Sequence, residues 1–315
     1  MTKRGTVGIV GSGLIGRSWA NVFARGGWSV VLWDPVASVR ASAVSQIETS
    51  LRELQEFGLV DDADAAVKRI RVAETLEDTV SVANFVQESG PETLEAKIDI
   101  FARMDAAAKP QTILASSTSA IVSSLFTEKL KGRARCLVAH PVNPPHLVPV
   151  VELCGAPWTS ADTVKRAREV FADVGQVPVT VNKEIDGFVL NRLQVALLAE
   201  AFRLVQDGVV SPADLDHTVA DGLGLRWAFM GPFETIELNA PEGIEDYCRR
   251  YTPWFRRYMK DLPPAGVWDD ANTAKVAAAY GPKPTAADVG KKSLWRNRRL
   301  AALAAHKRGA VRYKV

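Results

Sequence analysis

The chain has 315 residues, of which 47% are hydrophobic and 24% charged, and its formal net charge is +3. The length predicts about two domains, and the composition is ordinary for a soluble globular protein. The weak positive charge comes without a nucleic-acid-binding motif, so no nucleic-acid partner is expected. No apolar run approaches the roughly 20 residues of a membrane span, and the N-terminal residues lack the apolar region of a signal peptide. Three scattered cysteines are typical of a reducing compartment, so we expect a cytoplasmic protein.

The first half of the chain predicts strands that alternate with helices. Short apolar or β-branched stretches predict strands at 6–10, 28–34, 69–74, 83–89, 112–118, 133–140 and 149–153. Apolar residues at helical spacing predict helices after residue 13, through 42–57 and over 94–108. This alternation predicts an α/β fold with a doubly wound, mostly parallel sheet of the Rossmann type.

The second half predicts helices alone. From Gly187 to Gly208 the sequence predicts a helix that is apolar on most of its faces, which is typical of a buried helix. A small domain cannot bury such a helix on all sides, so we expect a homodimer built on the C-terminal helices. Another helix is predicted to begin with Ser211 as its N-cap. We therefore expect a Rossmann domain over 1–184 and an all-helical domain over 185–315.

A glycine-rich turn follows the first predicted strand and opens the next helix. Gly11, Gly13 and Gly16 have the G-x-G-x-x-G spacing. The first glycine permits a tight turn, the second lets the backbone approach a pyrophosphate, and the third lets helix and strand pack closely. Asp34 ends the next strand, where a carboxylate can bind the adenosine ribose and would repel the 2′-phosphate of NADP. The pattern predicts NAD, with FAD, S-adenosylmethionine or an empty glycine turn as alternatives.

A proline-rich stretch carries a histidine and a carboxylate twelve residues apart, His140 and Glu152. Prolines restrict the backbone, so the turn can hold the histidine in one orientation. The two residues are either a catalytic pair or a buried hydrogen-bonded couple. Histidine, with an ordinary pKa near ~6.5, can accept an alcohol proton near neutral pH. The pair therefore suits oxidation of an alcohol beside a nicotinamide.

The motifs ASSTSA, AHPVNPPHLVPVVE and GFVLNRL resemble the 3-hydroxyacyl-CoA dehydrogenase superfamily, and within it the lambda-crystallin and L-gulonate 3-dehydrogenase branch. The resemblance implies NAD-dependent oxidation of a small-molecule 3-hydroxy carboxylic acid, with L-gulonate as the leading substrate. The alternatives are an (S)-3-hydroxyacyl-CoA, a carnitine-like acid, or a structural role such as that of lens crystallins. The acyl-CoA enzymes have less proline after the histidine than the HPVNPP found here, which argues against a CoA substrate.

The resemblance also implies roles for single residues. It makes His140 the catalytic base and Glu152 its orienting carboxylate, with Ser119 and Asn191 hydrogen-bonding the reacting oxygen. It implies cofactor contacts at Gly11, Gly13, Leu14, Ile15, Gly16, Asp34, Glu92 and Lys97. Alternatively, Ser119 merely ends a strand, Asn191 is structural, and the last two cofactor residues form a surface ion pair. No metal site is expected.

Arg226 stands among glycine and apolar residues in GLGLRWAFMGPFE. An unpaired buried charge is costly, so this arginine must either pair with a carboxylate or reach solvent. The carboxylate belongs either to the substrate, bound by the planar guanidinium in a bidentate pair, or to Asp221 or Glu234. An acyl-CoA has a thioester in place of that carboxylate. His146 is expected to be structural or adjacent to the substrate.

Overall fold

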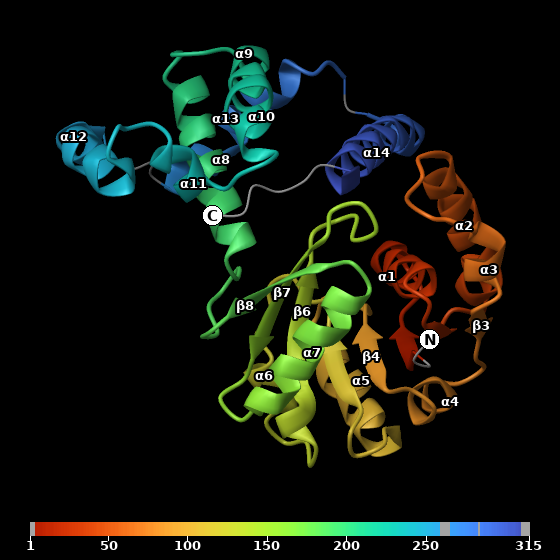
Figure 1. Ribbon diagram of the computed structural model, residues 1–315. Coiled ribbons are helices and arrows are strands. Elements are labelled where there is room, and N and C mark those ends of the chain that lie inside the picture. The colour runs from red at the N-terminus through yellow and green to blue at the C-terminus, as the bar shows by residue number, and fades with distance from the viewer. Residues whose placement is uncertain (1–3, 259–264, 283, 310–315) are drawn as a thin grey trace. The chain divides into compact units, whose positions relative to one another are not determined.

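An eight-stranded β-sheet forms the centre of the first part of the chain (Figure 1). The computed structural model describes residues 4–258, 265–282 and 284–309. The strands lie in the order β3-β2-β1-β4-β5-β6-β7-β8. Their bounds are β1 (Thr6–Val10), β2 (Ser29–Trp33), β3 (Ile70–Val72), β4 (Phe85–Glu88), β5 (Ile113–Ser116), β6 (Cys136–Pro141), β7 (Val150–Gly155) and β8 (Val177–Val181). Neighbouring strands are parallel except β6 and β7, which are antiparallel. The predicted Rossmann-type, mostly parallel sheet is confirmed.

Strand β8 is the one strand of this sheet that the sequence analysis did not predict. It contains Pro178, and the side chains of Val177 and Val179 are exposed. β8 lies at the edge of the sheet, where proline is tolerated because no further strand needs its missing N–H. An exposed edge strand therefore lacks the continuous apolar run that predicts a buried one.

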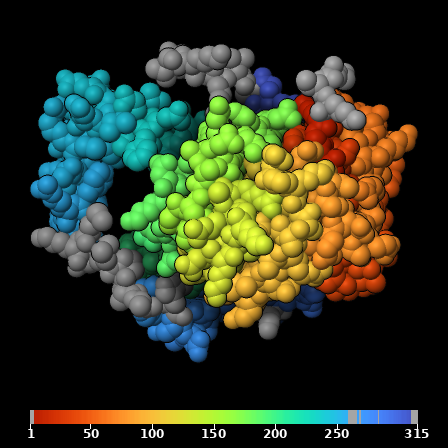
Figure 2. Space-filling model, turned by 90° about the horizontal axis from the view of Figure 1, so that it is seen from below, coloured from red at the N-terminus to blue at the C-terminus, as the bar shows by residue number. Residues whose placement is uncertain are grey.

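Helices cover both faces of the sheet, because successive residues of a strand point to opposite sides. In β1, Val7 and Ile9 belong to one apolar core and Val10 to the other. The helices on the first face are α1 (Leu14–Arg25), α2 (Ala37–Glu56), α3 (Ala63–Val67) and α7 (Ala161–Asp173). Those on the second face are α4 (Leu76–Ser81), α5 (Leu94–Ala107) and α6 (Ser124–Thr127). In Figure 2 the segments coloured from red to yellow-green form one continuous surface.

The second half of the chain is helical where the structure describes it, as the sequence predicts. Its elements are α8 (Leu190–Gln206), α9 (Pro212–His217), a π-helical stretch (Thr218–Leu223), α10 (Gly224–Trp227), α11 (Pro232–Glu237), α12 (Gly243–Tyr258), a short 3₁₀ helix (Ala265–Trp268) and α13 (Asp270–Ala278). Ser211 caps α9, accepting a hydrogen bond from the Asp214 N–H at 3.1 Å, so the predicted N-cap is confirmed. No helix in the described ranges is long and apolar enough to cross a membrane.

Helix α8 has apolar side chains that are exposed in the single chain. Leu193 and Val195 have 65% and 54% of their surface exposed, and Leu197 and Leu198 are exposed as well. The apolar pattern predicted the helix correctly, but nothing in the described part of this chain covers these side chains. This exposure agrees with the expectation that the chain's own domain cannot bury the helix on all sides, and its burial in a dimer stays a prediction.

The C-terminal helix α14 (Ala286–Gly309) also departs from the expected domains. The chain forms two compact units, a first unit of residues 1–191 and 289–315 and a second unit of residues 192–288. Most of α14 therefore belongs to the first unit, whereas the sequence analysis placed all of 185–315 in one C-terminal domain. Ala301 packs into the same core as Leu54 of α2, and Arg298 pairs with Glu56 at 3.3 Å. The local sequence of α14 does not indicate that the chain returns to the first unit. Residues 310–315 lie outside the described residues.

Candidate active site

The glycine-rich turn connects β1 to α1 at the point where the strand order reverses, between β1 and β4. Gly11 has φ +95°, and a Cβ there would lie 2.6 Å from the Ser89 carbonyl oxygen. A Cβ at Gly16 would lie 1.8 Å from the Gly11 carbonyl oxygen, so these two glycines are required by the fold itself. A Cβ at Gly13 would meet nothing within 4 Å. The space beside Gly13 fits a pyrophosphate close to the backbone, at the N-terminus of α1.

Asp34 follows β2 and is buried, and its carboxylate is already engaged by the backbone. Its Oδ2 accepts the Ser12 N–H at 2.8 Å, and its Oδ1 accepts the Val36 N–H at 2.9 Å. Each carboxylate oxygen can accept a further hydrogen bond, so the ribose hydroxyls can still bind there. Asp34 thus fixes the shape of the glycine turn in addition to its predicted contact with the ribose.

The predicted catalytic pair comes from two neighbouring strands. His140 of β6 and Glu152 of β7 are opposite each other in the antiparallel register, which explains their twelve-residue separation. The His140 Nδ1 lies 2.9 Å from the Glu152 Oε2, and both side chains are buried. Because a carboxylate only accepts hydrogen bonds, Nδ1 carries the proton and Nε2 of the neutral ring has a free lone pair.

The second oxygen of Glu152 is held by the first residues of α8. Its Oε1 accepts the Val189 N–H at 2.9 Å and the Leu190 N–H at 3.0 Å. Burial alone would raise the pKa of Glu152, but the hydrogen bonds from His140, Leu190 and Val189 outweigh it, and the pKa is lowered. The carboxylate therefore stays ionised at neutral pH and can stabilise an imidazolium at His140.

Phe188 is a residue of this site that the sequence analysis missed. Its φ is +48°, the one positive value outside glycine in the described residues, and it follows Gly187 with φ +76°. The buried ring has its centroid 5.5 Å from that of His140. Such a backbone is strained for a bulky residue. The bend places the ring against the imidazole and the next two N–H groups on Glu152.

Ser119 and Asn191, the predicted ligands of the reacting oxygen, are in contact. The Asn191 Nδ2 donates to the Ser119 carbonyl oxygen at 3.0 Å. Glu92 fixes the same loop, since its Oε1 accepts the Ser119 N–H at 2.8 Å and the Thr118 hydroxyl at 2.5 Å. The loop follows β5, which is parallel to β6, so Ser119 and His140 are delivered to the same edge of the sheet.

Lys97 is not part of a surface ion pair. Its side chain is 1% exposed, and Nζ lies 2.8 Å from Glu88 and 3.8 Å from Glu92. Buried Glu88 also accepts the Ser116 hydroxyl at 2.6 Å and the Gly90 N–H at 2.5 Å. Lys97 thus neutralises a buried carboxylate beneath the loop that carries Glu92. Direct cofactor contacts by Lys97 and Glu92 stay predictions.

Arg226 lies on α10 with an exposed side chain. Of its expected protein partners, Asp221 bonds His217 at 2.9 Å and Glu234 accepts the Gly231 N–H at 3.0 Å. Among the residues that the structure describes, neither acid forms an ion pair with Arg226. The side chain reaches solvent, the pairings with Asp221 and Glu234 are not formed, and the role of Arg226 in substrate binding stays a prediction.

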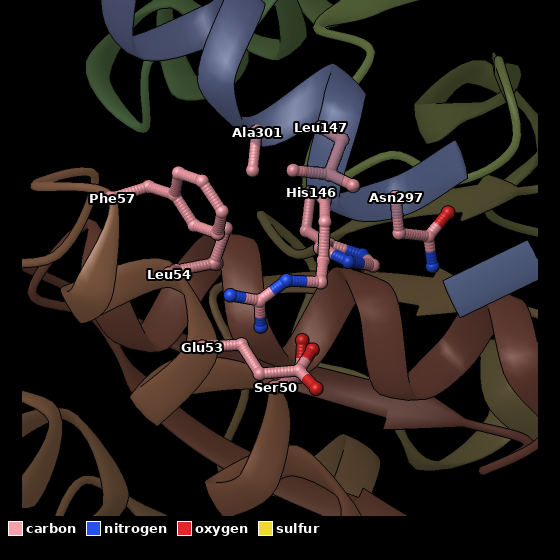
Figure 3. A pocket seen from close by; sticks show the side chains of 9 residues that line it. Ser50, Glu53, Leu54, Phe57, His146, Leu147, Asn297 and Ala301 are labelled. Atoms are coloured by element: carbon pink, nitrogen blue, oxygen red, sulfur yellow. The ribbon is translucent and has the colours of Figure 1, made fainter. Parts of the chain in front are cut away.

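His146 lies beside a small pocket between α2, the β6–β7 loop and α14 (Figure 3). The pocket is lined by Ser50, Glu53, Leu54, Phe57, His146, Leu147, Asn297, Arg298 and Ala301. Burial, followed by the charges of Arg25 and Arg296, lowers the pKa of His146 to about 4. A histidine that is neutral at pH 7 and lies under α14 fits the structural role.

Two family models match the chain, and together they cover most of it. Residues 6–185 match the NAD binding domain of 3-hydroxyacyl-CoA dehydrogenase, and residues 187–277 match its C-terminal domain. The chain belongs to the 3-hydroxyacyl-CoA dehydrogenase family. The predicted resemblance is confirmed, and so is NAD as the cofactor.

Some proteins similar to this chain are lambda-crystallins, as the resemblance predicted, and others are dehydrogenases with different names. The lambda-crystallin of Oryctolagus cuniculus is 41% identical over 309 residues, covering 96% of this chain and 97% of that protein. An L-carnitine dehydrogenase of Pseudomonas aeruginosa is 38% identical over 264 residues, covering 84% and 82%. Among solved structures, an NAD+-dependent 5-formyl-3-hydroxy-2-methylpyridine 4-carboxylic acid 5-dehydrogenase has a TM-score of 0.84 at 28% identity, covering 99% of this chain and 100% of that one. The chain thus belongs to a family of NAD-dependent hydroxy-acid and 3-hydroxyacyl dehydrogenases.

Proposed function

We propose that this dehydrogenase oxidises the 3-hydroxyl group of a free carboxylic acid, with L-gulonate as the leading substrate. The observation that carries the chemistry is the buried pair of His140 and Glu152, joined at 2.9 Å, with the carboxylate also held by two backbone N–H groups. This arrangement orients one ring nitrogen and leaves the other available as a base.

The residues of this chain then act as follows. His140 Nε2 accepts the hydroxyl proton of the substrate, and ionised Glu152 stabilises the resulting imidazolium. The Ser119 hydroxyl and the Asn191 amide hydrogen-bond the reacting oxygen. Asn191 Nδ2 uses one N–H on the Ser119 carbonyl oxygen, which leaves its second N–H for the substrate. Bound NAD supplies the hydride acceptor. Gly13, Asp34 and the N-terminus of α1 hold its phosphates and ribose.

Arg226 favours a free acid over an acyl-CoA. Its guanidinium is exposed, and neither expected acid of the chain occupies it. A planar guanidinium binds a carboxylate through two parallel hydrogen bonds, and a thioester offers no such partner. Overall similarity does not decide the substrate, because an L-carnitine dehydrogenase and a 3-hydroxyacyl-CoA dehydrogenase of Gibberella moniliformis are both 38% identical to the chain.

The substrate class is tested by NADH formation with L-gulonate, L-carnitine, free 3-hydroxybutyrate and 3-hydroxybutyryl-CoA. We expect kcat/KM to be highest for a free acid. Arg226→Lys should lose much of that value because the planar fork is lost, and Arg226→Met should lose more. Preference for the CoA thioester, or full activity of Arg226→Met on free acids, would refute this choice. A chain that binds NADH but oxidises none of the four would favour the crystallin-like alternative.

The proposal includes a cytoplasmic homodimer. The three cysteines Cys136, Cys154 and Cys248 are free, which fits a reducing compartment. Exposed apolar side chains on α8, together with Phe233 and Leu238 at 72% exposure each, offer apolar surface for an interface. Association of two chains through the C-terminal helices would cover such surface.

A further inference from the structure

Four side chains form a hydrogen-bonded network centred on Ser117, directly after β5. The Ser117 Oγ lies 3.1 Å from the Trp19 indole nitrogen and 2.7 Å from the Gln87 side-chain nitrogen. It also lies 2.9 Å from the Ser89 Oγ. The network therefore joins α1 to the carboxyl ends of β4 and β5.

The direction of each hydrogen bond follows from the donors available. An indole N–H can only donate. The Gln87 amide nitrogen is also fixed as a donor, because it lies 3.3 Å from the Ala139 carbonyl oxygen, which can only accept. Ser117 thus receives two hydrogen bonds, which use both lone pairs of its hydroxyl. Its own proton must go to Ser89, so the Ser89 hydroxyl is the acceptor in that bond and its proton points away from the network.

Ser89 lies where the dinucleotide binds. It is the residue after β4, and its N–H donates to the Val10 carbonyl oxygen at 2.7 Å. Its own carbonyl oxygen is the atom that a Cβ at Gly11 would strike. The hydroxyl bonds only Ser117 within the described ranges, and the residue is partly exposed. A hydroxyl proton that the network does not use is thus left at the point where the strand order reverses, which is the cofactor-binding position of this fold.

We propose that Ser89 is a further cofactor-contacting residue, whose hydroxyl is held by Ser117, Trp19 and Gln87 as a hydrogen-bond donor to an oxygen of NAD. Since Gln87 also bonds the carbonyl oxygen of Ala139, the residue before His140, the same network connects the cofactor site to the strand that carries the catalytic base. A hydroxyl whose proton is not used within the network can donate to the cofactor without breaking a hydrogen bond of the protein.

The test is the dissociation constant of NADH, measured by titration of the full chain without substrate. Ser89→Ala should weaken NADH binding about 5-fold, the effect of losing one neutral hydrogen bond. Its Tm without cofactor should fall only slightly, because Ser117 loses its acceptor but both serines are partly exposed and water can replace it. Ser81→Ala on the exposed face of α4 is the matched control and should bind NADH as the wild type does.

A double-variant comparison tests the network itself. Ser117→Ala should weaken NADH binding in the wild-type background but add no further loss in Ser89→Ala, because the hydroxyl that it orients is already absent. Wild-type affinity in Ser89→Ala, or an equal loss from Ser117→Ala in both backgrounds, would overturn the proposal. If Ser117→Ala does not fold, the affinity of Ser89→Ala alone decides. The titration involves no substrate, so its failure would leave the proposed reaction untouched.

Discussion

The two carboxylate oxygens of Glu152 have different hydrogen-bond partners in the active site. One oxygen accepts the His140 N–H and the other accepts two N–H groups at the start of α8. A glutamine in this place has only one accepting oxygen, so its NH₂ group must face a donor on one side. We expect Glu152→Gln to lower kcat by about 10²-fold or more and to lower the Tm as well. Steady-state kinetics and thermal unfolding would check both effects, and wild-type values for the two together would refute this role.

His146 makes the free energy of unfolding depend on pH, and its lowered pKa fixes the sign of that dependence. Its folded-state pKa is about 4, while an unfolded histidine titrates near ~6.5. Between these values the unfolded chain binds more protons, so the free energy of unfolding falls as the pH falls from about 6.5 to 4. We expect a shallower fall of Tm over this range in His146→Gln than in the wild type.

The exposed His217 is the control for this pH effect. Its bond to Asp221 raises its pKa, so its contribution to stability is present at low pH and is lost as the pH rises through the folded-state pKa. His217→Gln should therefore not make the fall of Tm towards acid pH shallower. Identical Tm–pH curves for the wild type and His146→Gln would show that the buried imidazole does not resist protonation.

At the scale of elements, the sequence predicts most of the sheet because its strands are buried apolar runs between turns. β1, β2 and β4 to β7 are mostly buried, and β3 at one edge is only partly buried but keeps the apolar Ile70 and Val72. β8 lies at the other edge, with Pro178 and exposed valines. The return of α14 to the first unit was not predictable, because it depends on packing of Ala301 near Leu54, about 250 residues earlier in the chain. Hydrophobic periodicity and secondary-structure propensity depend on the local environment of a segment. They do not show which distant segment covers its apolar face.

Helix α8 provides the prediction at this scale. Its exposed leucines and valines are expected to lie in an interface between two copies of the chain, so light scattering should report a dimer at micromolar concentration. Leu193→Glu should shift the protein to monomer, because it places a charge in the apolar interface. The control Leu125→Glu, at an exposed leucine of α6, should remain dimeric. A wild-type monomer at micromolar concentration would refute the interface.

At the scale of the whole molecule, the first unit contains the cofactor turn and the residues of the proposed proton transfer. The sequence predicts His140, Glu152 and the glycine turn because their spacing carries the chemistry. Phe188 and the network of Trp19, Ser89 and Ser117 depend on contacts between distant segments, and no spacing in the sequence marks them. The second unit contains Arg226, on which the proposed choice of substrate depends. It also contains most of α8, on which the proposed dimer depends.

The rate of NADH formation by His140→Ala, measured together with its NADH dissociation constant, tests the central claim most directly. If His140 is the base, kcat falls by about 10²-fold or more while NADH binds nearly as tightly as to the wild type. The glycine turn and Asp34 are formed by other residues, which is why binding should survive. Wild-type turnover in His140→Ala would contradict the account.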